Sequence, residues 1–184
     1  MLDHAASGFA AALAAVAPDQ WELPTGNDGQ DVRALVDHVI GGDRMATAIL
    51  RGGSREEGIA AFARSQFDVD LVAAFASSRT ALMAAFSEPG ALERVVHHPS
   101  LDMPGSMLLG FRLTEYALHG WDLARAVGAD DTIDVDVLEA LWAFMSPMAG
   151  LVAGSGMFGE GPSGDVLEHA PLQDRVLDLS GRRP

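Results

Sequence analysis

The chain has 184 residues, of which 48% are hydrophobic and 21% are charged, a composition typical of one soluble globular domain. The formal net charge of −14 argues against nucleic acid or an anionic membrane as a partner. The sequence has no cysteine, which excludes disulfides, cysteine-ligated metals and a protein thiol nucleophile.

The first half of the chain predicts three helices. An alanine-rich helix is expected from about Asp3 to Val16, and because no lysine or arginine precedes it, we interpret it as an ordinary helix and not a signal peptide. After a turn-rich connection at residues 24–30, Asp31 can cap a second helix that ends near residues 52–53. A third helix is expected at about residues 69–86.

The second half begins with a loop or short extended excursion at residues 91–105, followed by a helix through 111–126. A further helix is expected at about 135–152, with a kink near Pro147, and a last short helix at 172–181. The pattern predicts an all-α, up-and-down four-helix bundle with short extra C-terminal helices. We expect a single domain over residues 1–184, in which residues 153–184 form a Gly-rich connection and a short helix. No apolar run reaches the roughly 20 residues of a membrane span, so a cytoplasmic protein is expected.

The stretch "FRLTEYALHGWDLARA", residues 111–126, places four ionisable groups on one line of a helix. Arg112, Glu115, His119 and Asp122 follow each other at helical spacings, next to the apolar face. One interpretation is two pairs, Arg112 with Glu115 and His119 with Asp122, on a partly exposed face. The other makes Glu115 and His119 ligands of a divalent ion, because both can reach one metal from adjacent turns.

A metal needs a third protein ligand, and His38 is the best candidate because it shares an apolar face of the second helix. A lone inward histidine is also compatible with a hydrogen-bonded core residue. Gly42, one turn beyond His38, is expected to leave space beside the ion. His97 and His98 precede Pro99 in the expected loop, where they form either a solvated turn or a donor over the site.

The stretch "DVRALVDHVIGG", followed about eighty residues later by "RLTEYALHGWDLARAVG", resembles the DinB-like metal-binding superfamily. The resemblance is to the actinobacterial branch that contains the metal-binding domain of mycothiol-dependent maleylpyruvate isomerase, and the closing "PLQDRVLDLSGRRP" is similar to small members of that branch. It implies a bundle with zinc or nickel held by His38, Glu115 and His119, and thiol-dependent chemistry in some members. Members often carry a Cys and a Trp before the second helix, where this chain has "GNDGQ", and the chain is too short for the isomerase's separate C-terminal domain.

Our main hypothesis is a metal-dependent enzyme that activates a mycothiol-like thiol, or water, for transfer, isomerisation or hydrolysis. Arg112 then orients an acidic substrate or thiol cofactor, or else forms an ion pair with Glu115 or Asp122, and Asp122 orients His119 from the second layer of the site. The alternatives are a homodimeric metal-binding module without catalysis, and a helical interaction protein without a metal. The expected partners are a small-molecule substrate or thiol and a second copy of the chain.

Overall fold

A computed structural model describes residues 1–27, 29–64, 70–150 and 161–183. By its internal contacts, Leu2–Asp131 forms one compact unit, and Thr132–Pro184 forms a second together with Met1. The single domain expected over residues 1–184 stays a prediction. Within the described ranges, no helix is both long enough and apolar enough to cross a membrane.

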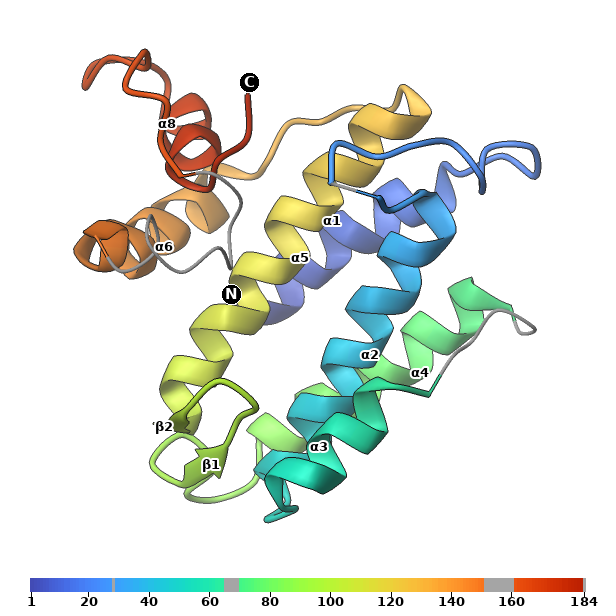
Figure 1. The fold of residues 1–184 in the computed structure, drawn as a ribbon, viewed down its shortest axis with the longest axis vertical. Helices are drawn as coiled ribbons and strands as arrows, with labels where there is room; N and C mark the ends of the chain where they lie inside the picture. The colour runs from blue at the N-terminus through green and yellow to red at the C-terminus, as the bar shows by residue number, and fades with distance from the viewer. Residues whose placement is uncertain (28, 65–69, 151–160, 184) are drawn as a thin grey trace. The chain divides into compact units, whose positions relative to one another are not determined.

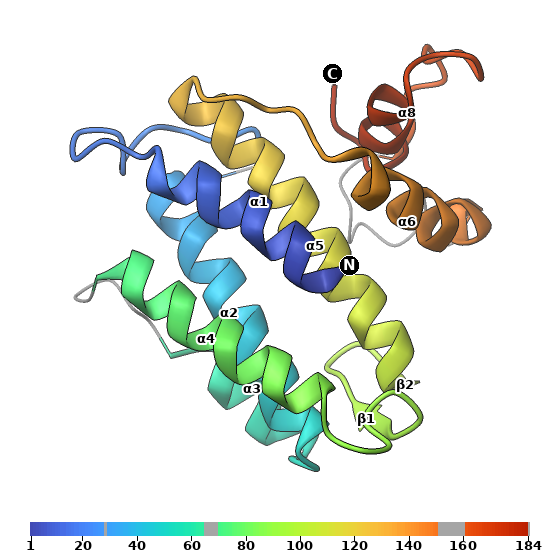
Figure 2. The same ribbon diagram turned by 180° about the vertical axis from the view of Figure 1, so that it is seen from behind.

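The larger unit is the expected four-helix bundle, with one additional short helix (Figure 1). Its helices are α1 (Leu2–Ala14), α2 (Val32–Leu50), α3 (Arg55–Phe62), α4 (Leu71–Phe86) and α5 (Gly105–Val127). Helix α1 packs against α4 and α5, and α2 packs against the same two helices (Figure 2). The structure thus confirms the all-α class and the predicted long helices of this unit.

The helix directions follow an up-down-down-up order in place of strict alternation along the chain (Figure 1). Ser78 on α4 bonds Asp43 on α2, and Glu88 just after α4 pairs with Arg51 just after α2, so the two helices run in the same direction. Helix α5 runs antiparallel to α2, because Arg112 near its start contacts Asp43 and Glu115 contacts His38. This antiparallel pair α2–α5 brings the predicted ligands to the same level of the bundle.

Local chemistry fixes where these two helices begin and end. The Asp31 side chain caps α2 as predicted, accepting from the Ala34 amide at 2.8 Å. Helix α5 ends at Gly128, whose φ of 71° is the left-handed conformation that glycine adopts without steric cost. Between the helices, the rings of Phe9, Phe75 and Tyr116 pack at centroid distances of 4.8 to 6.3 Å. The bundle core therefore extends along the face of α5 next to the ionisable line.

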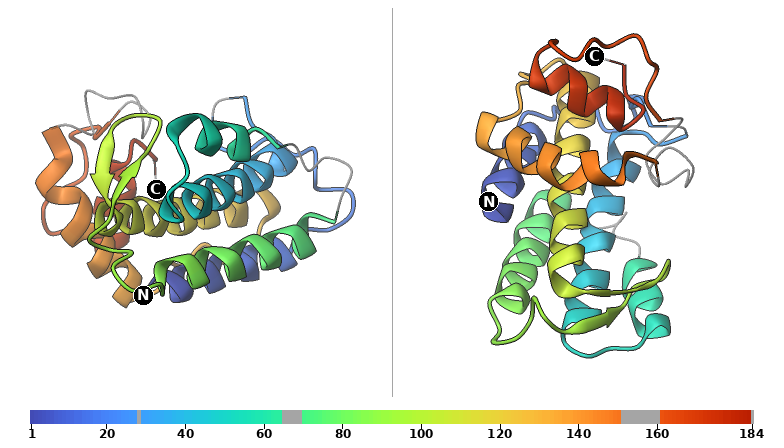
Figure 3. Two further views of the ribbon diagram at one scale, coloured as in Figure 1. Left: turned by 90° about the horizontal axis from the view of Figure 1, so that it is seen from below. Right: turned by 90° about the vertical axis from the view of Figure 1, so that its left-hand side faces the viewer.

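Helix α3 was missed by the sequence analysis, although its start carries a recognisable signal. Ser54 and Glu57 form a capping box, in which each side chain bonds the other residue's backbone amide. The extended excursion expected at 91–105 is confirmed as a hairpin of β1 (Val95–His97) and β2 (Asp102–Pro104), which leads directly into α5 (Figure 3). Arg94 donates to the Leu50 carbonyl, so the hairpin is tied to the end of α2.

The smaller unit contains α6 (Val135–Met145), a 3₁₀ turn η1 (Ser146–Met148) and α8 (Leu172–Leu179). The turn η1 contains Pro147, where the sequence predicted a kink, and α8 confirms the predicted final helix. The expected continuation of the helix to residue 152 and most of the Gly-rich passage lie outside the described residues.

Candidate metal centre

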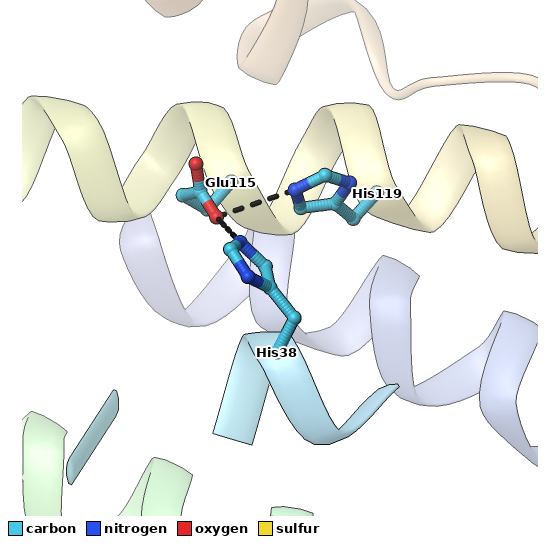
Figure 4. A group of neighbouring side chains, drawn as sticks. All are labelled: His38, Glu115 and His119. Atoms are coloured by element: carbon cyan, nitrogen blue, oxygen red, sulfur yellow. Dashed lines mark hydrogen bonds and ion pairs between the residues drawn. The ribbon is translucent and has the colours of Figure 1, made fainter. Parts of the chain in front are cut away.

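Two imidazoles, one from α2 and one from α5, converge on one carboxylate oxygen of Glu115 (Figure 4). Glu115 and His119 lie one turn apart on α5, and the antiparallel α2 places His38 opposite them. Oε2 of Glu115 lies 3.1 Å from Nε2 of His38 and 3.3 Å from Nε2 of His119. All three donor atoms lie within 4.8 Å of one another. The structure thus brings together the three residues selected from the sequence, which we call the three-donor cluster.

The chemistry and spacing of the three-donor cluster suit a divalent ion. A tetrahedral zinc bound at about 2.0–2.2 Å separates neighbouring donors by about 3.3–3.6 Å, so the separations at Glu115 Oε2 need only small shifts. Two imidazoles and one carboxylate are also a ligand set of catalytic zinc sites, which keep one position open. The His38 and Glu115 side chains are 33% and 25% exposed, so a small molecule can reach the cluster from one side.

Asp122 lies behind His119 and fixes which ring nitrogen faces the cluster. Its Oδ2 lies 3.1 Å from Nδ1 of His119 and accepts a hydrogen bond from that nitrogen in the tautomer that carries the proton on Nδ1. Nε2 of a neutral His119 then directs a lone pair at the oxygen of Glu115. That tautomer leaves two acceptors facing each other at 3.3 Å, which suits a metal ion between them, whereas a proton on Nε2 lets His119 donate to Glu115 directly.

Asn27, from the "GNDGQ" connection, lies with Asp122 behind His119 and was not selected from the sequence. Its Nδ2 donates to Asp122 Oδ2 at 3.0 Å and lies 3.0 Å from Nδ1 of His119. The amide therefore holds the Asp122 carboxylate against the imidazole. The connection before α2 thus supplies a hydrogen-bond donor to the residues behind His119.

Glu115 is held in the ionised form that a metal requires. Burial alone would raise the pKa of this carboxyl, but His119, His38 and Arg112 together hold the pKa well below its usual range. The same three neighbours would also stabilise the carboxylate without a metal. The surroundings of Glu115 therefore suit its carboxylate both with a metal bound and without one.

Arg112 is buried and belongs to a polar network inside the bundle. Its Nη2 donates to Asp43 Oδ1 at 2.8 Å and to the Val39 carbonyl at 3.1 Å, whereas Glu115 Oε2 lies 3.8 Å from Nη1. Burial lowers the pKa of Arg112, but Asp43, Tyr116 and Glu115 together outweigh it, so the net pKa is raised and Arg112 stays charged. With only 3% of Arg112 exposed, the geometry favours an ion pair over substrate orientation, but the close partner is Asp43 in place of the expected Glu115 or Asp122.

Asp43 is the residue of this network that the sequence analysis missed. Its Oδ1 also accepts from Tyr116 at 2.7 Å, and its Oδ2 accepts from Ser78 at 2.7 Å. A signal was present, because Asp43 lies at helical spacing among apolar residues of α2 that are all fully buried. These are Val36, Val39, Ala46 and Leu50. An acid in such a stripe needs a buried cation.

The expectation that Gly42 leaves space beside a metal is wrong. A Cβ built on Gly42 would lie 2.9 Å from Cζ of Arg112 and closer still to Nη1. The space above Gly42 is thus filled by the Arg112 guanidinium on its way to Asp43. Glycine is required here because the Arg112 side chain from α5 occupies the space that a Cβ on α2 would need.

The hairpin histidines have different positions. His97 is exposed and its Nδ1 lies 3.0 Å from Asp102 Oδ1, so it pairs within its own hairpin. The ring of His98 stacks on Phe111 of α5, with centroids 6.3 Å apart. On another side, Phe62 of α3 packs edge-on against His38, with centroids 5.4 Å apart. Two aromatic contacts thus lie near the cluster, one from Phe62 of α3 directly on the ligand His38 and one from the hairpin's His98 on Phe111 of α5.

The bundle order and the His–Glu–His cluster between α2 and α5 define the DinB-like class of helical domains. Within that class, a family model described as the mycothiol maleylpyruvate isomerase N-terminal domain matches residues 2–124. The chain belongs to this family.

Two curated relatives are the uncharacterized proteins MT0763 and Rv0738 from two strains of Mycobacterium tuberculosis. Each is 30% identical over 152 residues, which cover 78% of this chain and 77% of the relative. A crystal structure of mycothiol-dependent maleylpyruvate isomerase superimposes with a TM-score of 0.64 at 18% identity, covering 80% of this chain and 66% of that one. A histidine-to-alanine mutant of that enzyme gives a TM-score of 0.67 at 19% identity, covering 84% and 71%. The present chain thus spans about two thirds of the isomerase's length, and the likeness shows a common fold.

Proposed function

We propose that the protein binds one divalent metal ion through His38, Glu115 and His119 and uses it to activate a low-molecular-weight thiol or water. The observation that carries the proposal is the arrangement of two imidazole Nε2 atoms at 3.1 and 3.3 Å from a single carboxylate oxygen. Zinc is the first choice of metal and nickel the second, because imidazole and carboxylate donors suit both. The reaction class is transfer, isomerisation or hydrolysis.

The protein's own residues prepare the site for this role. Asp122 and Asn27 fix His119 so that Nε2 faces Glu115. Arg112, held by Asp43, adds to the effect of the two histidines in lowering the pKa of Glu115. The metal would supply a Lewis acid that lowers the pKa of a thiol or water placed at the open side. The chain has no cysteine, so a thiol nucleophile has to come from a second molecule. The family, whose name refers to mycothiol, supports a small thiol as that molecule.

The strongly negative chain also supports the absence of a nucleic-acid partner, and a homodimer is the assembly that we propose. The protein's molar mass in solution tests the homodimer independently of the metal site, against 19.3 kDa for a single chain.

The experiment for the proposed function compares zinc-loaded and chelated protein in reactions of small thiols with electrophiles, including the isomerisation of maleylpyruvate with mycothiol. We expect turnover above the solution rate in the zinc-loaded protein, its loss on chelation, and its absence in His119→Ala. Zinc binding without thiol-dependent turnover would make the protein a non-catalytic metal-binding module. No zinc binding would leave a helical interaction protein.

A further inference from the structure

The turn between β1 and β2 presents His98 from a firmly held backbone. Arg55 of α3 donates through Nη1 to the carbonyls of both His98 and Pro99, the latter at 2.7 Å. Its Nη2 donates to Asp102 Oδ1 at 2.8 Å, on the other strand of the hairpin. One guanidinium thus joins α3 to both sides of the turn. A backbone fixed in this way positions the side chain that it carries.

The His98 ring packs on α5 at the level just before Glu115 of the three-donor cluster. It stacks on Phe111 with an interplanar angle of 29°, and Phe111 lies one helical turn before Glu115 on the same face of α5. Phe111 and Glu115 are therefore about one turn, or about 5.4 Å, apart along the axis of α5. This is about the size of a small molecule that would occupy the open side of the cluster.

The hydrogen bonds of His98 determine what its other nitrogen offers. The Ser100 amide donates to Nδ1 at 3.2 Å, so Nδ1 is an acceptor and the proton of the neutral ring is on Nε2. Burial, and after it the charge of Arg55, lower the pKa of His98, which keeps the ring neutral at neutral pH. Within the described part of the chain, no acceptor is hydrogen-bonded to Nε2. The half-buried ring therefore presents an available N–H donor.

We propose that the Nε2–H of His98 donates a hydrogen bond to the small molecule that binds at the three-donor cluster, and so selects thiols that carry a carbonyl oxygen a few bonds from the sulfur. The inference rests on the proposed function and adds to it the substrate class and a positioning residue. A hydrogen-bond donor at this position raises the affinity for a ligand that has an acceptor there and leaves the affinity for an acceptor-free ligand unchanged. The adjacent His97, exposed and paired with Asp102, has no such role.

The test measures thiol binding to cobalt-loaded protein from the change in its visible absorption. The probes are N-acetylcysteamine, which has an amide carbonyl, and 1-propanethiol, which has none. His98→Phe keeps a ring over Phe111 and removes the N–H, and His97→Phe is the matched control. We expect His98→Phe to weaken N-acetylcysteamine binding about 3- to 10-fold, the effect of one neutral hydrogen bond, and to leave 1-propanethiol binding and cobalt content unchanged. His97→Phe should change neither thiol.

Equal weakening of both thiols in His98→Phe would mean that the ring acts only on the structure of the site, and no weakening would mean that Nε2 contacts no ligand. Either result, with cobalt content unchanged, overturns this inference alone. A wild-type protein that binds no cobalt overturns the proposed function, and this inference with it.

Discussion

Replacing Asp43 with asparagine keeps the size of the side chain and removes the charge that faces the buried guanidinium of Arg112. The amide oxygen can still accept from Arg112 and Tyr116, and the Ser78 hydroxyl can turn to accept from the new amide N–H. Hydrogen bonding is therefore preserved in large part. The substitution isolates the contribution of the charge.

The expected loss in free energy of unfolding follows from the burial of the Asp43–Arg112 ion pair. The Asp43 and Arg112 side chains are 0% and 4% exposed, and removing one partner of a buried ion pair costs about 3–5 kcal/mol. Glu115, 3.8 Å from Nη1, compensates part of the remaining charge, so we expect a value near the lower end, about 3 kcal/mol.

The assay is urea unfolding of chelated protein, followed by far-UV circular dichroism, with the free energy obtained by linear extrapolation. The matched control is Asp3→Asn, because Asp3 pairs with Arg79 and its side chain is 71% exposed. An exposed pair of this kind contributes about 0–1 kcal/mol. If Asp43→Asn destabilises the protein no more than Asp3→Asn, the buried charge pair is not what holds Arg112 beneath the cluster.

Three further predictions concern the same region. Gly42→Ala should destabilise the protein by about 1–3 kcal/mol because its Cβ displaces the Arg112 guanidinium, whereas Gly8→Ala, with open space around it, should stabilise α1 by about 0.5–1 kcal/mol; equal effects in urea unfolding would contradict this account. Asp122→Asn should weaken metal binding about 10- to 100-fold in a competitive chelator titration, and an unchanged affinity would remove Asp122 from the second layer of the site. The lowered pKa of Glu115 means that its carboxylate stabilises the chelated fold fully above the ordinary value of about 4.3, and that this contribution disappears as the pH falls through the lowered pKa. Glu115→Gln should therefore destabilise the chelated protein more at pH 6 than at pH 3, and the opposite order would be evidence against an ionised Glu115.

The sequence was sufficient for the parts of the fold that depend on local chemistry. The Asp31 cap, the apolar spacing of the long helices and the pair Glu115–His119 one turn apart are all set within a few residues of each other. Helix α3 was predictable by the same means, because Ser54 and Glu57 form a standard helix-start signal.

Contacts between distant segments were much harder to predict. Asp43 and Arg112 each interrupt an apolar stripe, which shows that each needs a partner but does not show which one. Asn27 reaches His119 across 92 positions of sequence, and no local pattern marks a loop asparagine for that role. The level at which His38 meets Glu115 depends on the antiparallel packing of α2 and α5, so for this pairing the family resemblance was needed as well.

The most direct test of the account is the metal content of protein prepared without a histidine tag, incubated with zinc, dialysed and measured by elemental analysis. We predict one ion per chain in the wild type and in His97→Ala, which removes a histidine outside the cluster, and loss of most metal in His38→Ala and His119→Ala. All four proteins should keep the same helical circular dichroism spectrum. Metal content that is unchanged in both cluster variants, or that falls equally in His97→Ala, would contradict a metal centre formed by His38, Glu115 and His119.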